Sequence, residues 1–172
     1  MIARIPNSHG SITLEAASEA NPGWKVEREA DGSFTMSPTG TMSGLHDTQV
    51  VALLLQWQKQ AGGQLFGSST GFTMPDESLL SPDATWISAE RWSAVPDALK
   101  IGYAPIVPDV CVEVVSRTDE VGYLIAKLQR YRRYGATYVL LVDPWRRKTW
   151  SDGVMPFGFP TDFTSVFDAG KT

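Results

Sequence analysis

The chain has 172 residues, of which 42% are hydrophobic and 20% charged, and its formal net charge at pH 7 is −4. This length and composition are typical of a globular domain with a buried core and exclude a disordered chain, so we expect one domain over residues 1–172. The negative net charge removes the general attraction to nucleic acid that dedicated binders show. Any DNA-binding surface must therefore be local.

The cysteine count and the N-terminal sequence indicate a cytoplasmic protein. Cys111 is the single cysteine, lies in an apolar run and is interpreted as a small buried hydrophobic residue. The first ten residues include the polar Asn7, Ser8 and His9, where a secretory signal needs an apolar run. No segment reaches membrane-spanning length, so we expect no membrane partner.

The N-terminal third predicts a hairpin followed by a helix. Residues 1–23 are small and polar and are expected to form a short helix or an N-terminal arm. Apolar and polar residues then alternate on both sides of Asp31-Gly32, which predicts strands at about 24–29 and 33–37. Apolar residues recur at helical spacing over 45–60, and Gly62-Gly63 ends this predicted helix.

The rest of the chain predicts a sheet with one crossover helix. Strand-like runs occupy 64–74, 84–87 and 110–115, separated by loops that contain proline. A second amphipathic helix is predicted over 118–134, a buried strand over 137–142, and an edge extension over 150–172. The run over 110–115 is almost wholly apolar, as in a central strand covered on both faces. The step from this strand through the helix to the next strand predicts a right-handed parallel crossover.

The order helix, three strands, helix, strand predicts an α/β fold. An N-terminal β-hairpin precedes this α/β core.

Two carboxylates occupy positions where strand propensity does not favour them. Asp83 precedes a short strand, and Glu113 lies among valines. If the two strands are neighbours, both acids face one cleft, where burial without a partner costs several kcal/mol each. Mg²⁺ removes this cost, because it prefers hard oxygen ligands. The alternative is structural: Asp83 caps a turn and Glu113 pairs with an arginine.

Lys127 is the third candidate. At about 100° per residue it lies about 40° from Tyr131, on the flank of the helix's buried stripe. Its stem would be covered while its ammonium could reach over the strand ends to position water or stabilise negative charge. The alternative is a solvated lysine beside the core.

Several motifs between residues 22 and 148 resemble, in order, those of the Uma-two family of bacterial endonucleases. They are Trp24-Lys25-Val26-Glu27, Asp31-Gly32, Met36-Ser37-Pro38, Ser68-Ser69-Thr70-Gly71-Phe72, Ser81-Pro82-Asp83-Ala84-Thr85-Trp86, Pro108-Asp109 with Val110 to Ser116, Lys127 with Tyr131, Gly135, and Val142-Asp143-Pro144. That family is similar to the PD-(D/E)XK superfamily, so the resemblance implies a restriction-endonuclease-like core, with a mixed central sheet flanked by helices. It also implies a metal site built from an aspartate on one strand and a glutamate on the next.

Carried over residue by residue, the resemblance assigns Asp83 and Glu113 to the metal site. Val115 occupies the place where many superfamily members keep lysine, and Lys127 matches a lysine moved onto the following helix. Members often add an acid from the first helix, where this chain offers only Asp47 at the start. Glu27 from the hairpin is the other candidate acid, with a surface strand glutamate as its alternative.

Two further motifs are rejected as catalytic. Asp109 stands about 13 Å along an extended strand from Glu113, too far to share one ion, and is interpreted as an opening turn. The pattern Gly67-Ser68-Ser69-Thr70-Gly71 resembles a serine nucleophile turn, but no helix follows it and both histidines, His9 and His46, precede it.

The sequence therefore predicts a metal-dependent endonuclease in which Asp83 and Glu113 bind Mg²⁺ or Mn²⁺ and Lys127 positions water or stabilises charge. DNA is the expected substrate. Basic residues near the end of the second helix and after the last strand are candidate phosphate contacts, although such runs are often solvated faces. They include Arg130, Arg133, Arg146 and Arg147. A catalytically inactive binding or assembly module is the alternative, favoured by the negative net charge. The oligomeric state stays open, and a homodimer is one arrangement.

Overall fold

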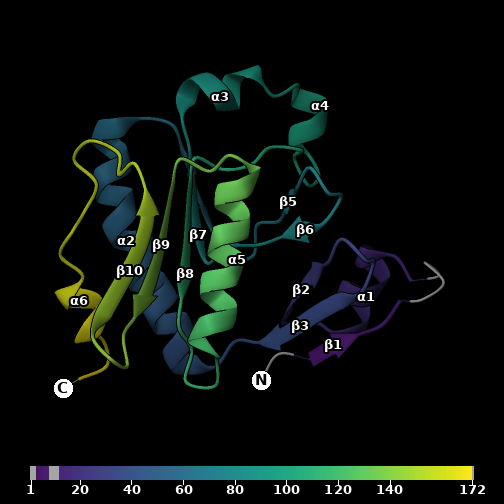
Figure 1. Cartoon of the computed structure of the whole chain (residues 1–172), viewed down its shortest axis with the longest axis horizontal. Coiled ribbons are helices and arrows are strands. Elements are labelled where there is room, and N and C mark those ends of the chain that lie inside the picture. Colours follow the sequence, from purple (N-terminus) through teal and green to yellow (C-terminus); the bar gives the residue numbers. More distant parts are fainter. Residues whose placement is uncertain (1–2, 8–11, 172) are drawn as a thin grey trace.

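The computed structural model describes residues 3–7 and 12–171, in which two β-sheets lie beside each other (Figure 1). His9 and the rest of 8–11 lie outside the described residues, as do residues 1–2 and 172. Within the described part, no helix is both long and apolar enough to cross a membrane.

The first sheet is built on the N-terminal hairpin, and its strands pair antiparallel in the order β1-β3-β2-β6-β5. The bounds are Ala3–Ile5 for β1, Trp24–Arg28 for β2, Phe34–Pro38 for β3, Phe72–Thr73 for β5 and Leu79–Leu80 for β6. The predicted strands at about 24–29 and 33–37 are confirmed. The N-terminal segment adds an edge strand and a helix, α1 (Leu14–Ala20), which packs Leu14 and Ala17 against the apolar face of the hairpin.

The second sheet is the predicted mixed sheet. Its order is β10-β9-β8-β7-β4, and only the central pair β8 and β9 is parallel. The bounds are Gln64–Gly67 for β4, Ala84–Ile87 for β7, Val110–Val114 for β8, Tyr138–Asp143 for β9 and Lys148–Gly153 for β10. The parallel pairing expected from the crossover helix is thus confirmed.

Two long helices cover the two faces of this sheet (Figure 1): α2 (Thr41–Ala61) and α5 (Val121–Tyr134). The sequence of β8 explains why both faces are covered, because successive side chains of a strand point to opposite faces of the sheet. Val110, Val112 and Val114 share a core with α2, whereas Cys111 and Val115 share one with α5. Glu113 has the parity of Cys111 and therefore faces α5.

The predicted run over 64–74 is not one strand. β4 ends at Gly67, a turn follows in which Thr70 N–H donates to the Gly67 carbonyl at 3.1 Å, and β5 joins the other sheet. Gly71 allows this crossing, since a Cβ there would lie 2.6 Å from a Leu79 side-chain carbon. No helix follows this turn, consistent with the rejection of a serine nucleophile there.

Other elements extend the sequence-based prediction. The first long helix begins at Thr41, four residues earlier than expected, and the loop between β7 and β8 contains the short helices α3 (Ala89–Ala94) and α4 (Asp97–Lys100). The C-terminal part of the chain contributes β10 as an edge strand of the mixed sheet. It then adds α6 (Thr164–Phe167) and places Phe159, Phe163 and Val166 in the core beside α2.

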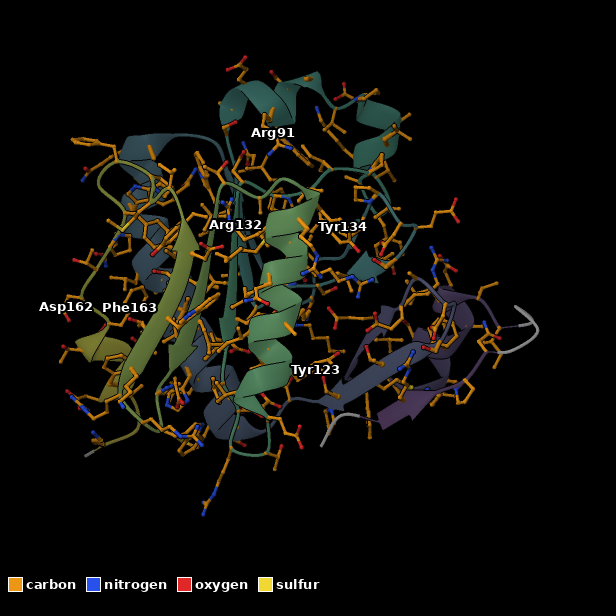
Figure 2. All side chains as sticks on the ribbon, in the orientation of Figure 1. Arg91, Tyr123, Arg132, Tyr134, Asp162 and Phe163 are labelled. Atoms are coloured by element: carbon orange, nitrogen blue, oxygen red, sulfur yellow. The ribbon has the colours of Figure 1, made fainter. Side chains whose placement is uncertain are left out.

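A charged network attaches the hairpin sheet to α5. Arg130 contacts Glu29 at 2.5 Å and Asp76 at 3.1 Å, and Tyr134 donates a hydrogen bond to Asp76. Tyr134 lies in the last turn of α5, at the opposite end of the helix from Tyr123 (Figure 2). The network therefore joins the strand end after β2, the turn between β5 and β6, and the C-terminal half of α5.

Candidate active site

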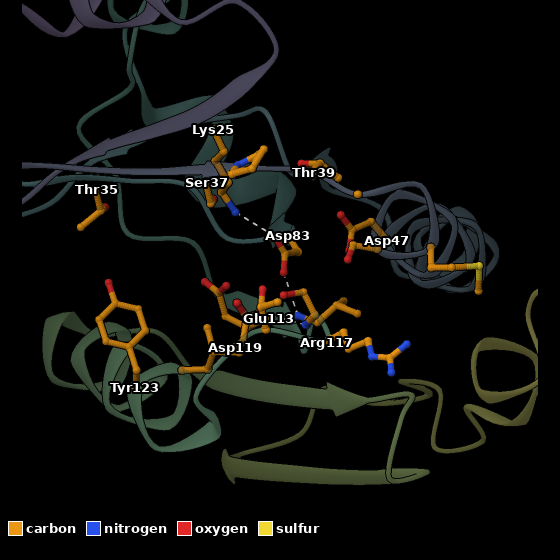
Figure 3. Close-up of a pocket in the computed structure, with 18 of the residues that line it drawn as sticks. Lys25, Thr35, Ser37, Thr39, Asp47, Asp83, Glu113, Arg117, Asp119 and Tyr123 are labelled. Carbon is orange, nitrogen blue, oxygen red and sulfur yellow. Dashed lines mark hydrogen bonds and ion pairs between the residues drawn. The ribbon is translucent and has the colours of Figure 1, made fainter. Parts of the chain in front are cut away.

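A cavity of about 580 Å³ lies where the hairpin sheet meets one end of the mixed sheet. Its wall comes from β2 and β3, from the first turns of α2, from the segment after β8 and from the first turns of α5 (Figure 3). All four residues proposed from sequence as catalytic or acidic, Asp83, Glu113, Lys127 and Glu27, line this cavity.

Asp83 and Glu113 lie at the same end of two neighbouring strands. β7 and β8 pair antiparallel, and the last pair at this end is Ala84 with Val112, so Asp83 and Glu113 are each the next residue beyond it. The hydrogen bond from Asp83 N–H to the Val112 carbonyl, 2.9 Å, holds Asp83 against β8. Both side chains line the cavity. Strand pairing thus explains how acids 30 positions apart in the sequence converge.

The carboxylate of Asp83 is held on both sides. Its Oδ1 lies 2.8 Å from Lys25 Nζ, and its Oδ2 accepts a hydrogen bond of 2.8 Å from Val114 N–H. Lys25 comes from β2, so the hairpin sheet supplies the cation that partners an acid of the other sheet. Burial lowers the pKa of Lys25, but the carboxylates of Asp83, Glu113 and Glu27 together outweigh this and leave the pKa above its usual 10.5.

Lys127 lies between two buried carboxylates. Its Nζ is 2.8 Å from Glu27 Oε1 and 2.9 Å from Glu113 Oε1. Burial opposes its charge, but Glu113 and then Glu27 raise the pKa of Lys127 well above its usual value, so it stays protonated. Glu27 also accepts a hydrogen bond from Ser81 N–H, in the segment that leads from β6 to Asp83. Because both side chains are buried, the alternative interpretations of Lys127 as a solvated lysine and of Glu27 as a surface glutamate disagree with the structure.

The cavity is lined by more acidic than basic side chains. Its lining includes five acids, Glu27, Asp47, Asp83, Glu113 and Asp119, against Lys25, Lys127 and Arg117. Burial is the main cause that raises the pKa of Glu113 to about 7, in spite of Lys127. Burial and then the Asp83 carboxylate raise the pKa of Asp47 to about 8. At neutral pH the site therefore retains protons that a bound cation would displace.

The residues present fit a divalent metal ion. Lys127 approaches Glu113 Oε1 without hydrogen-bond geometry, and this buried oxygen has no hydrogen-bond partner within the described residues. No cluster of three or more histidine, cysteine, aspartate or glutamate side chains forms a ready-made metal site in the part of the chain that the structure describes. Mg²⁺ nevertheless needs only one or two carboxylates, because water and substrate phosphate complete its coordination. Asp83 and Glu113 would hold it, with Asp47 at the same cavity.

Sequence analysis missed Lys25 as a member of the site and gave Asp47 only as a residue at a helix start. The signal for Lys25 was its spacing: Lys25 and Glu27 are two positions apart on one strand, so they share a face. Asp47 lies in the second turn of α2, because this helix starts at Thr41.

The arginines proposed as phosphate contacts do not line the cavity. Arg130 belongs to the network with Glu29 and Asp76, Arg146 pairs with Asp143 at 2.9 Å, and Arg147 pairs with Asp168 at 2.5 Å. Arg133 is exposed near the end of α5. Arg117, which sequence analysis did not single out, is instead exposed at the cavity.

Two other positions have structural roles. Asp109 is buried, pairs with Arg91 at 2.6 Å and accepts a hydrogen bond from Ser88 N–H, so it fastens the start of α3. Val115 packs in the core with Leu124 and Leu128 of α5. Val115, at the position where many superfamily members keep lysine, is therefore a core residue. Lys127 reaches the site from α5 instead.

Comparisons with known proteins show the family and the fold of this chain. The family model described as "Uma2: Putative restriction endonuclease" matches residues 13–151. Among solved structures, the chain is similar to "a putative nuclease belonging to DUF820 from Anabaena variabilis", at 16% sequence identity and a TM-score of 0.64, over 91% of this chain and 98% of that chain. At this identity the likeness shows the shared fold alone. The comparison with curated proteins found no match. The family match confirms the resemblance drawn from the motifs: the chain belongs to the Uma2 family of restriction-endonuclease-like proteins.

Proposed function

We propose that this protein is a metal-dependent endonuclease that hydrolyses DNA phosphodiester bonds, with Asp83 and Glu113 binding Mg²⁺ or Mn²⁺. One observation carries the proposal: two acids at the same end of neighbouring strands share a cavity lined by more acidic than basic side chains. Membership of the Uma2 family supports the reaction class.

The chemistry asked of the site is hydrolysis of a phosphodiester. The oxygen of one water forms a bond to phosphorus, one P–O ester bond breaks, and the leaving oxygen ends as a hydroxyl group. When bound, a divalent cation supplies Lewis acidity toward the phosphate and lowers the pKa of water. Lys127 adds a fixed positive charge beside Glu113, where it orients water or stabilises the charge that develops.

The test is cleavage of supercoiled plasmid and of labelled oligonucleotides with Mg²⁺ or Mn²⁺ at pH 8. Wild type is expected to cut, whereas Asp83→Asn and Glu113→Gln are expected to lose cleavage and to bind Mn²⁺ more weakly in calorimetry. Glu90→Gln, an exposed change on α3, is the matched control and should behave as wild type. Cleavage by wild type that survives EDTA, or that survives both acid substitutions, contradicts the proposal.

A catalytically inactive module that binds or assembles is the competing function, and the net charge of −4 favours it. DNA binding without cleavage under every metal condition would select this function. The expected cytoplasmic location and the homodimer stay predictions, and sedimentation analysis of the purified chain tests the second.

A further inference from the structure

Two lysines enter the cavity, and their surroundings differ. Lys127 is 8% exposed and lies between Glu27 and Glu113. The Lys25 side chain is 16% exposed and forms one ion pair within the described residues, with Asp83. An ammonium has three N–H donors. Lys25 therefore keeps donor capacity toward the cavity, whereas Lys127 is shared between two carboxylates.

The hairpin presents further donors beside Lys25. β2 and β3 pair with Lys25 opposite Ser37 and Glu27 opposite Thr35, and all four residues line the cavity (Figure 3). The Thr35 hydroxyl oxygen is buried and has no hydrogen-bond partner within the residues that the structure describes. A buried hydroxyl without a partner costs roughly 1 to 3 kcal/mol, so a ligand or water that satisfies it is favoured there.

Three donors on the hairpin wall, where the carboxylate of Glu27 is paired with Lys127, lie across the cavity from the acids of the mixed sheet, and this arrangement suits a phosphodiester. The acids Asp83 and Glu113 belong to the mixed sheet, and the donors Lys25, Thr35 and Ser37 belong to the hairpin sheet. A phosphate anion is repelled by the acidic wall and attracted by an ammonium and hydroxyl groups, which are common phosphate contacts.

We propose that Lys25 is a further catalytic residue, whose ammonium contacts the phosphate that is cleaved, with the Thr35 and Ser37 hydroxyls on the same wall. This inference rests on the proposed function and deepens it: the hairpin sheet binds the substrate phosphate, and the mixed sheet supplies the two acids that bind the metal. Lys127 acts on the opposite side, beside Glu113.

The experiment compares Lys25→Met and Lys25→Arg with Lys59→Met. Lys59 is exposed in the last turn of α2, about 18 Å along the helix from Asp47, so its replacement makes the same change in net charge away from the cavity. Affinity for a labelled oligonucleotide is measured without divalent metal at several salt concentrations. Lys25→Met should reduce the slope of log affinity against log salt by about one relative to Lys59→Met, because one phosphate contact is lost.

Two further measurements separate a phosphate contact from a structural role. Single-turnover cleavage with saturating Mn²⁺ should fall by about 10² to 10³ in Lys25→Met, the usual effect of one preorganised donor. Lys25→Arg should recover part of the rate and the salt slope. Affinity for Mn²⁺ should stay equal or increase in Lys25→Met, since the lysine no longer holds Asp83 Oδ1.

The outcomes distinguish this inference from the proposed function. If wild type cleaves and Lys25→Met matches Lys59→Met in both salt slope and cleavage rate, the role of Lys25 is overturned. The nuclease proposal then still stands. If Lys25→Met lowers the salt slope but wild type never cleaves, the phosphate contact is supported and the proposed hydrolysis is overturned. If wild type binds the oligonucleotide no more strongly than Lys25→Met does, the contact between Lys25 and the phosphate is overturned.

Discussion

Replacing Glu113 with glutamine should stabilise the metal-free protein above pH 7. Glutamine resembles the protonated glutamic acid, so the variant represents a site without the Glu113 charge. Burial is the main cause that raises the pKa of Glu113 from 4.5 to about 7. Because one pKa unit corresponds to 1.36 kcal/mol, the ionised form costs the folded state about 3 kcal/mol. That is a large share of a typical stability of about 5 to 15 kcal/mol.

The stability of wild type depends on pH because proton binding by Glu113 is linked to folding. The folded state holds the Glu113 proton more tightly than the unfolded chain does, so this contribution to stability is complete below pH 4.5 and is lost as pH rises toward about 7. Wild type and Glu113→Gln should therefore be equally stable near pH 4.5 and differ most above pH 7. Asp47 also has a raised pKa, but it titrates in both proteins.

The assay is urea unfolding followed by tryptophan fluorescence in EDTA, between pH 4.5 and pH 9. With a slope of about 1 to 3 kcal/mol per molar urea, the midpoint of Glu113→Gln should exceed that of wild type by on the order of 1 to 3 M at pH 8. Saturating Mn²⁺ should stabilise wild type and not the variant. Equal midpoints at pH 8, or a difference that does not vary with pH, would refute the reasoning and make Glu113 a stabilising partner of Lys127.

Three further substitutions test other contacts. Lys127→Met leaves Glu27 and Glu113 buried without their shared cation and should cost about 3 to 5 kcal/mol at pH 8 in the same titration, whereas a cost below about 1 kcal/mol contradicts the burial described above. Burial opposes ionisation of Asp76, but hydrogen bonds from Ser78, Tyr134 and Arg130 hold its pKa well below the usual range. Asp76→Asn should therefore lower the free energy of unfolding by about 1 to 2 kcal/mol at pH 7. Thermal melts at pH 3 and below should show a smaller difference, because protonation of Asp76 removes the same stabilisation from wild type. Gly63 has φ +73°, and a Cβ there would lie 2.4 Å from the Ile87 carbonyl oxygen. Gly63→Ala should cost about 2 kcal/mol and lower the melting temperature by roughly 4 to 8 °C, while Gly44→Ala, whose Cβ has room, should not.

The mixed sheet was predictable because its signals are local. The strand over 84–87 and the central strand of valines were recognised from residue type, and Glu113 attracted notice because a carboxylate is rare in such a run. The meeting of Asp83 and Glu113 required only that their two strands be neighbours, which the structure shows.

The contribution of the hairpin sheet could not be derived in the same way. Alternation placed Lys25 and Glu27 on one face, but no local pattern states which surface that face covers. The splitting of 64–74 between two sheets has the same origin, since a turn signal marks where a strand ends and not which sheet the chain joins next. The arginines were misleading for a related reason: their partners Glu29, Asp76 and Asp168 are distant in sequence, so the pairing that neutralises them is a tertiary property.

The division of the cavity between two sheets has a consequence for the growing or partly folded chain. Asp83 and Glu113 come together as soon as β7 and β8 pair, but Lys25 and Glu27 arrive only when the hairpin sheet docks, a step held by Arg130 and Asp76. An intermediate with the mixed sheet formed and the hairpin detached would hold two crowded acids and no lysine from the hairpin. Under the proposed function, hydrolysis would then depend on completed docking. This dependence also makes Arg130, which does not line the cavity, a position where a destabilising change can disrupt the site without altering any of its groups.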